Sequence, residues 1–424
     1  MLYSEALQYI HSLMRFGSRP GLERITELLK VLGNPQDDLE IIHVAGTNGK
    51  GSTSTMISSV LQCAGKKTGL YISPFVTEFN ERIQINGKPI SNDDLGVYTE
   101  RVKSAVELTS DDDCPITEFE FITAVAFLYF KEQKCDAVVL EVGLGGRLDA
   151  TNVIKTPKVS VITRIALDHT GILGETEAEI ASEKCGIIKK NCPVVTTKDN
   201  SPESFEVIRK IAKERNCELT ITNINEVNVL SADIFGSEFL WQGETYKLKL
   251  AGKHQISNAL NVISAVKVAF PDISLDAIKQ GLGNTVFPAR CEVISKEPLV
   301  ILDGSHNPNG TSALNELLTD SNIKNSTAIV GFMADKDVSD ALQCLKQKFN
   351  KIITVKVQSN ARTMEAEDLA ILCKGICDNV TVAESYEKAL ELVKEDSKVI
   401  VFGSLYLAGD IRPLLIDRYS TKIV

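Results

Sequence analysis

Residues 40–53 read EIIHVAGTNGKGST, in which a short apolar run is followed by a glycine-rich turn and by small polar residues. The apolar run predicts a buried strand, and residues 54–63 beyond the turn have the pattern of a helix. Glycines between a strand and a helix let backbone N–H groups converge on an anion, and the helix N-terminus adds the positive end of its dipole. The stretch therefore predicts a loop that binds the phosphates of a nucleoside triphosphate.

Individual residues of this loop have expected roles. Lys50 would reach the β- and γ-phosphates, and Ser52 or the threonine after it would contact a magnesium ion or a phosphate oxygen. The loop departs from the usual pattern, because Gly51 follows the lysine and only two residues separate Gly46 from Gly49. A glycine-rich strand–helix turn that binds no ligand is therefore the alternative interpretation.

The length and charge of the chain limit what it can be. Its 424 residues exceed one ordinary hydrophobic core, so we expect at least two domains. The net charge of −10 argues against a nucleic-acid partner. No apolar run approaches the roughly 20 residues of a membrane span, no secretory signal is visible, and the ten cysteines form no CxxC pair. We therefore expect a cytoplasmic protein without membrane or nucleic-acid partners.

Short β-branched runs alternate with helical patterns, which is typical of βαβ units and a mainly parallel sheet. The predicted elements are strands at residues 40–44, 137–140, 159–162, 299–302, 327–330, 352–355 and 399–402, and helices at 339–349 and 386–395. Residues 223–250 instead predict antiparallel strands, because aromatic and β-branched residues recur between glycine turns. A polar stretch at 295–298 predicts a boundary between domains of residues 1–296 and 297–424. The expected fold class is α/β, with a mainly parallel phosphate-loop domain and a smaller Rossmann-like C-terminal domain.

Polar side chains follow two of the predicted strands. Glu141 follows the strand at 137–140, where nucleotide-binding folds place a magnesium ligand, and a capped strand end is the alternative. His169 follows the strand at 159–162 and would bind a metal or donate a proton to a phosphate. Such a histidine is more often structural, unless adjacent strands bring it and Glu141 into one crevice. Lys184 lies in a predicted helix at 177–185, where a solvated position is the ordinary interpretation.

Seven motifs in order resemble one protein family. They are GTNGKGS at 46–52, SP at 73–74, EVGLGGRLD at 141–149, DH at 168–169, EK at 183–184, HQISNA at 254–259 and DGSHNP at 303–308. Over nearly the whole chain they resemble the folylpolyglutamate synthases, with the related dihydrofolate synthases, in the Mur ligase superfamily. Gly51, which departs from the common phosphate loop, is itself the form found in folate ligases.

The resemblance implies a reaction and a set of residue roles. ATP would phosphorylate a carboxylate of the pterin substrate, and the amine of L-glutamate would attack the acyl phosphate to give an amide, ADP and phosphate. The matching positions are Gly49, Lys50, Gly51, Ser52, Asn258, Arg290 and Asp303 for ATP, Ser73, Glu141 and His169 for magnesium, and Asp149, His306 and Ser404 for the substrates. Lys50, Lys184, Asp149 and His306 are the catalytic candidates. Lys184 matches a lysine that CO2 carbamylates in the superfamily.

Residues 71–83 resemble the mobile loop that lies beside the folate in this family. Phe75 would stack on a pterin, and Arg82 would meet a carboxylate. An ordinary surface loop with a buried phenylalanine is the alternative.

The resemblance also implies the cofactors and substrates. We expect two Mg²⁺ sites, room for a monovalent cation, and a monomer that uses ATP, a reduced folate, L-glutamate and, in bifunctional members, dihydropteroate. Two other functions are the alternatives. A Mur peptidoglycan ligase would carry an extra domain before its phosphate loop, and Gly46 comes too early for that. A nucleotide-binding regulatory module without ligase chemistry would have no use for the motifs at 254–255 and 303–308.

Overall fold

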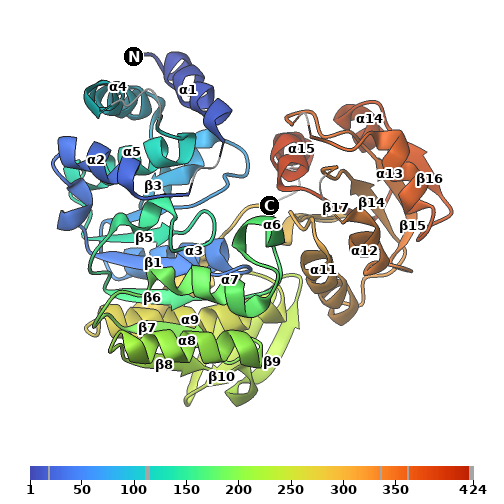
Figure 1. Cartoon of the computed structure of the whole chain (residues 1–424). Helices are drawn as coiled ribbons and strands as arrows, with labels where there is room; N and C mark the ends of the chain where they lie inside the picture. Colours follow the sequence, from blue (N-terminus) through green and yellow to red (C-terminus); the bar gives the residue numbers. More distant parts are fainter. Residues whose placement is uncertain (18–19, 110–114, 335–336, 361, 420–424) are drawn as a thin grey trace. The chain divides into compact units, whose positions relative to one another are not determined.

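The computed structural model describes residues 1–17, 20–109, 115–334, 337–360 and 362–419 (Figure 1). The chain divides into two compact units, each assembled from segments that are not contiguous in the sequence. The first unit contains Met1–Phe75, Phe79–Val227 and Ser257–Asn284, and the second contains Val76–Glu78, Asn228–Ile256 and Thr285–Val424. In the described part of the chain, no helix combines the length and the apolar character that crossing a bilayer requires.

The first unit is built on an eight-stranded sheet with the order β4-β3-β2-β5-β1-β6-β7-β8. Its strands are β1 (Ile41–Ala45), β2 (Thr68–Tyr71), β3 (Ile83–Ile85), β4 (Lys88–Pro89), β5 (Ala137–Glu141), β6 (Val159–Ile162), β7 (Val194–Thr197) and β8 (Leu219–Thr222). All pairs are parallel except those of β3 and β4 at one edge. Every residue of β1, β5, β6 and β7 is buried, as in a parallel sheet covered on both faces. The prediction of a mainly parallel sheet is confirmed.

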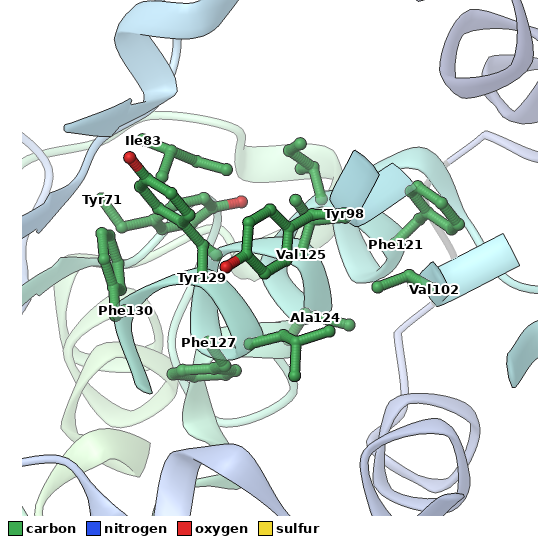
Figure 2. Packing of buried hydrophobic residues seen from close by; sticks show 14 of the residues in the cluster. Tyr71, Ile83, Tyr98, Val102, Phe121, Ala124, Val125, Phe127, Tyr129 and Phe130 are labelled. Atoms are coloured by element: carbon green, nitrogen blue, oxygen red, sulfur yellow. The ribbon is translucent and has the colours of Figure 1, made fainter. Parts of the chain in front are cut away.

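Helices cover this sheet. They are α1 (Tyr3–Ser12), α2 (Glu23–Val31), α3 (Lys50–Cys63), α4 (Asn92–Thr109), α5 (Glu118–Glu132), α6 (Thr170–Leu173), α7 (Glu177–Lys184), α8 (Pro202–Glu214), most of α9 (Lys253–Ala269) and α10 (Leu275–Asn284). Figure 1 shows α1, α2, α4 and α5 grouped beside β3 and β5. Figure 2 shows part of the buried cluster that joins α4 and α5 to the sheet, in which Phe121, Phe127 and Phe130 of the apolar helix α5 lie with strand residue Tyr71 and with Tyr98 of α4. This core fixes the strand ends that carry the candidate site.

The second unit contains a six-stranded sheet with the order β12-β13-β17-β14-β15-β16, parallel except for β12. Its strands are β12 (Glu292–Lys296), β13 (Leu299–Leu302), β14 (Ser326–Val330), β15 (Phe349–Thr354), β16 (Val380–Val382) and β17 (Lys398–Phe402). Its helices are α11 (Pro308–Asp320), α12 (Val338–Gln343), α13 (Ala366–Cys373), α14 (Tyr386–Leu392) and α15 (Leu405–Tyr419). The second α/β sheet confirms the predicted fold class.

A separate three-stranded antiparallel sheet belongs to the same unit. It consists of β9 (Asn228–Asp233), β10 (Gly236–Trp241) and β11 (Glu244–Leu248), so the antiparallel strands expected within 223–250 are confirmed. The polar stretch at 295–298 spans the end of β12 and the turn into β13. A domain boundary after residue 296 stays a prediction.

Three predicted helices differ clearly from the structure at their ends, and one of them, expected at 386–395, ends at Leu392 as α14. The helix expected at 339–349 is wrong in its second half, because α12 ends at Gln343 and Phe349 already begins β15. Gln347 has a left-handed backbone with φ 68°, which interrupts any helix before the strand. The helix expected from residue 54 begins at Lys50 instead, since Gly49 takes the left-handed conformation before it.

Candidate active site

The phosphate loop follows β1 directly and is anchored by the segment after β6. The backbone N–H groups of Thr47 and Asn48 donate to the carbonyl oxygen of Arg164 at 2.9 and 3.1 Å. The Thr47 hydroxyl donates to the carbonyl oxygen of Ala166 at 3.0 Å, and the Thr163 hydroxyl donates to that of Asn48 at 2.9 Å. The loop is therefore held in one conformation before any ligand arrives, which reduces the entropy lost on binding.

Glycine is required at the end of this loop. Gly49 has φ 88°, and a Cβ atom there would overlap Oδ1 of Asn258 on α9. Asn258, a predicted ATP contact, therefore lies against the loop. The Lys50 Nζ donates to the carbonyl oxygens of Gly46 and Thr47 at 3.0 and 3.3 Å, so its charge lies over the loop.

The first turn of α3 contains Lys50, Gly51 and Ser52. The helix begins without a side-chain cap, and a helix N-terminus presents N–H groups and the positive end of its dipole to an anion. The glycines of the loop, Lys50 and the N-terminus of α3 thus provide the N–H groups and the positive charge that a phosphate site requires.

Glu141 and Ser73, two of the predicted magnesium ligands, lie together. The Glu141 carboxylate at the end of β5 is buried, and its Oε2 accepts from the Ser73 backbone N–H at 3.1 Å. The third candidate, His169, does not follow an adjacent strand, because β1 separates β5 from β6. Its side chain is 47% exposed, and its backbone N–H donates to Asp168 Oδ1 at 2.9 Å. Glu141 and His169 would share a crevice if they followed adjacent strands. The strand order shows that they do not.

The donors at this strand end fit a hard divalent cation. The Ser73 hydroxyl and the Glu141 carboxylate offer the oxygen ligands that Mg²⁺ prefers. Across the described ranges, no three His, Cys, Asp or Glu side chains are grouped to hold a metal ion. A magnesium ion here would therefore also take oxygens from phosphate and water, as it does in many ATP sites.

Asp149 is buried in the loop that follows β5. Its Oδ2 accepts from the Leu144 backbone N–H at 2.9 Å. Its Oδ1 accepts from the backbone N–H of Thr151 at 3.0 Å and from the Thr151 hydroxyl at 2.5 Å. Burial raises the pKa of Asp149, whereas these donors act in the opposite direction.

Lys184, the last residue of α7, is also buried, so its interpretation as a solvated lysine is wrong. The cause is tertiary, because the loop after β5 packs on the end of α7 so closely that a Cβ on Gly146 would lie 2.7 Å from the Lys184 carbonyl oxygen. Burial, together with the charge of Lys50, lowers the pKa of Lys184 to about 7, although Asp168 and Asp149 oppose the shift. A buried amine that is partly neutral near pH 7 can act as a nucleophile.

The Arg82 guanidinium lies beside the rings of Phe75 and Phe79. The ring centroids of Phe75 and Phe79 are 5.8 Å apart, and the Arg82 guanidinium lies 5.5 and 5.2 Å from them. Arg82 also lies 3.8 Å from the Glu118 carboxylate. A ligand carboxylate at Arg82 would therefore compete with Glu118.

The second unit places two candidates where neighbouring strands end. Asp303 follows β13, and its carboxylate accepts from the N–H groups of Cys291 and Ser305 at 2.8 and 2.9 Å. Ser404 follows β17, and its hydroxyl accepts from the Tyr406 N–H at 3.0 Å. Strands β13 and β17 are parallel neighbours, so both residues lie at the sheet edge where open α/β folds bind ligands.

His306 and Arg290 flank that strand end in the sequence. The Nδ1 atom of His306 lies 3.1 Å from the carbonyl oxygen of Gly304. The Arg290 guanidinium lies 5.6 Å from the ring centroid of Phe287. His306 is close to Asp303 in the sequence, and Arg290 precedes Cys291, whose N–H binds Asp303; the substrate contacts of His306 and Arg290 stay predictions.

Sequence reasoning missed several residues that hold the site. Thr163 and Arg164 anchor the phosphate loop, and the available signal was a hydroxyl residue directly after a buried strand. Thr151 binds Asp149, and His43 in turn contacts Thr151 at 2.9 Å. A histidine inside the apolar run of β1 was the signal for this last contact.

Comparison with known proteins identifies the family. Residues 44–266 match the Mur ligase middle domain, and residues 289–405 match the Mur ligase glutamate ligase domain. The chain is 36% identical to a folylpolyglutamate synthase of Lacticaseibacillus casei, covering 99% of this chain and 100% of that one. It is 37% identical to a dihydrofolate synthase/folylpolyglutamate synthase of Bacillus subtilis, covering 97% and 99%.

A solved structure agrees with these relatives. Folylpolyglutamate synthase of Mycobacterium tuberculosis, complexed with ADP and AMPPCP, superposes with a TM-score of 0.87 at 30% identity, over 97% of this chain and 99% of that one. Fold, domain matches and full-length similarity agree, and the chain belongs to the folylpolyglutamate synthase/dihydrofolate synthase family of Mur ligases.

Proposed function

We propose that the protein is an ATP-dependent ligase that forms an amide between a carboxylate of a folate substrate and the amine of L-glutamate. With tetrahydrofolate the reacting group is the γ-carboxylate, and with dihydropteroate the same chemistry makes dihydrofolate. The observation that carries this function is the preformed phosphate loop, in which Gly49 packs on Asn258 and Lys50 Nζ donates to carbonyl oxygens of the loop. It occurs in a chain that matches folate ligases over its full length.

The reaction proceeds in two steps. A carboxylate oxygen attacks the γ-phosphorus of ATP, and ADP leaves an acyl phosphate behind. The glutamate nitrogen then attacks the carbonyl carbon, loses a proton, and expels phosphate. The Lys50 ammonium and the N-terminus of α3 hold the β- and γ-phosphates, where negative charge spreads as the phosphoryl group moves.

Magnesium fits the same site. When bound, it would neutralise phosphate charge and polarise the transferred group. The Ser73 hydroxyl and the Glu141 carboxylate would hold it, and these two residues are already joined by the Ser73 N–H. We propose that the enzyme binds two magnesium ions and one monovalent cation. His169 would be a ligand of one of the magnesium ions.

Lys184 is proposed to carry a carbamate. Its nitrogen lone pair would attack CO2 and release a proton, which turns a cation into an anion. Only the neutral amine reacts, and a pKa of about 7 makes the neutral form abundant near physiological pH. The anion would offset the charge of Lys50 and of a bound cation.

The remaining candidates are assigned to substrates. A domain of residues 297–424 acts as the glutamate ligase domain, and the protein works as a monomer. The assignments are Asn258, Arg290 and Asp303 for ATP, Phe75 and Arg82 for the pterin and its carboxylate, Asp149 for catalysis or substrate orientation, and His306 and Ser404 for glutamate.

ADP release tests this function directly. The protein would be supplied with MgATP and L-glutamate, together with tetrahydrofolate, with dihydropteroate, or with no pterin. Release with both pterins indicates a bifunctional enzyme, and release with tetrahydrofolate alone indicates a dedicated polyglutamate synthase. Protein that binds ATP but shows no pterin-dependent release would contradict the ligase function and support a nucleotide-binding regulatory module.

A further inference from the structure

A histidine with no assigned role lies in the middle of the central strand. His43 is fully buried, and its strand β1 lies between β5 and β6 in the sheet. Its Nε2 lies 2.9 Å from Oγ1 of Thr151, whereas its Nδ1 is buried and has no hydrogen-bond partner among the described residues. Thr151 in turn contacts Asp149, so a chain of three side chains leads from the strand to the loop that follows β5.

The hydrogen bonds fix the direction in which protons are donated along this chain. Both oxygens of Asp149 accept from backbone N–H groups, Oδ2 from Leu144 and Oδ1 from Thr151, so the carboxylate acts as an acceptor throughout. The Thr151 hydroxyl has one proton and lies 2.5 Å from Oδ1, to which it donates. Its oxygen must then accept from His43, which requires the tautomer that carries its proton on Nε2.

The imidazole is a permanent neutral donor. Burial is the main reason that the pKa of His43 is lowered to about 3, and the charge of Lys189 acts in the same direction. The ring therefore carries a single proton wherever the protein is folded near neutral pH. It holds a hydrogen bond in place and does not exchange protons with the reaction.

Core packing alone does not account for a histidine here. On the face of the sheet that His43 occupies, its register partners are the apolar Leu140 of β5 and the buried polar Ser160 of β6, whereas Ile42 and Val44 point to the opposite face. The Thr151 contact uses only one ring nitrogen, and the buried Nδ1 without a partner carries a desolvation cost that an aliphatic side chain would avoid. Residues that cost stability in a core are often retained for a functional site.

We propose that His43 is a positioning residue of the ligase reaction, which donates from Nε2 to Thr151 and thereby commits the Thr151 hydroxyl to Asp149. The Asp149 carboxylate is then held in one orientation in the loop that packs on Lys184. Without the histidine, the Thr151 oxygen loses the donor that fixes its orientation, so its hydrogen bond to Asp149 is less firmly oriented. His43 can have this role only if Asp149 acts in catalysis or substrate orientation, as proposed above.

Nitrogen NMR tests the proton arrangement without any enzymatic activity. In protein labelled with ¹⁵N-histidine, the signals of His43 are those missing from His43→Gln. The expected result is a neutral ring protonated on Nε2 across the neutral pH range. A ring protonated on Nδ1, or on both nitrogens, would overturn the proposal even if the protein is an active ligase.

Kinetic variants test the functional consequence. His43→Leu and Thr151→Val should each lower kcat about tenfold or more while the KM for ATP stays within about twofold, because the phosphate loop is untouched. His43→Gln keeps an N–H donor near the Nε2 position and should retain kcat within about threefold of the wild type. Thr99→Val is the matched control, since the buried Thr99 hydroxyl has no partner within the described part of α4 or its surroundings.

A double-mutant cycle separates positioning from a structural role. If His43 acts through Asp149, adding His43→Leu to Asp149→Asn should change kcat by less than about twofold. The proposal would be contradicted if the kcat of the double variant fell by the product of the two single fold-losses. It would also be contradicted if His43→Gln had as low a kcat as His43→Leu. If His43→Leu does not fold, Thr151→Val in the same cycle gives the same answer. Absence of pterin-dependent turnover in the wild type would instead refute the proposed function, and the NMR result would stand apart from it.

Discussion

Replacing Lys184 with methionine should stabilise the protein while it removes the proposed carbamate site. The fold buries this amine and lowers its pKa from 10.5 to about 7. Each pKa unit corresponds to about 1.4 kcal/mol, so holding the ammonium inside the fold costs up to about 5 kcal/mol relative to the unfolded chain. This value is an upper limit, because water admitted beside the ammonium reduces the cost. Lys184→Met keeps the length of the side chain without its charge.

The stability gained by Lys184→Met should decrease as the pH rises. Between pH 7 and 10.5 the unfolded chain binds the Lys184 proton and the folded chain does not, so wild-type stability rises with pH across this window. Below this window the folded wild type must hold the proton, and the advantage of Lys184→Met is greatest. It should shrink towards zero as the pH approaches 10.5.

Urea unfolding in CO2-free buffer at about pH 6 and about pH 10 measures this difference. Lys30→Met is the control, since the Lys30 side chain is 70% exposed and its loss should change stability by less than about 0.5 kcal/mol at either pH. A gain that is equal at both pH values, or a variant less stable than the wild type at the lower pH, would refute the burial argument.

Three further predictions concern the site. Lys50→Ala should lower kcat about 100-fold or more, because the transferring phosphoryl group loses its charge partner; near-full activity would contradict the phosphate-loop assignment. Gly49→Ala should raise the KM for ATP about tenfold or more, since its Cβ would displace Asn258, whereas Gly65→Ala, with φ 81° and open space around it, should cost only about 1 kcal/mol of stability. Lys184→Ala should be partly rescued by acetate or propionate in turnover assays; no rescue, with an unmodified lysine in the wild type by mass spectrometry, would exclude the carbamate.

Local sequence patterns predicted most of the fold. The strands at 40–44, 137–140 and 159–162 are buried runs whose hydrophobicity is independent of what packs on them. Sequence patterns did not predict where a helix ends when the conformation of a single residue decides it. Gln347 is left-handed, and no propensity distinguishes it from a residue that would continue the helix predicted at 339–349.

The candidate site was predictable where motifs carry it and not where tertiary packing does. The glycine-rich turn between a strand and a helix predicts the role of Lys50, and the family resemblance implies that of Gly49. The burial of Lys184 arises from the packing of Gly146 on the end of α7. The ordinary interpretation of a helical lysine, a solvent-exposed side chain, is therefore wrong here. His169 illustrates another limit, because local sequence does not specify strand order, and β1 separates β5, which ends at Glu141, from β6, which precedes His169.

The acyl phosphate is the central claim, and isotope transfer tests it most directly. Tetrahydrofolate labelled with ¹⁸O in its γ-carboxylate would be incubated with the enzyme, MgATP and L-glutamate, and the released phosphate would be analysed by mass spectrometry. Because a carboxylate oxygen bonds to the γ-phosphorus and leaves with it, each phosphate formed with product should contain one ¹⁸O atom. Amide product accompanied by unlabelled phosphate would contradict the acyl phosphate route.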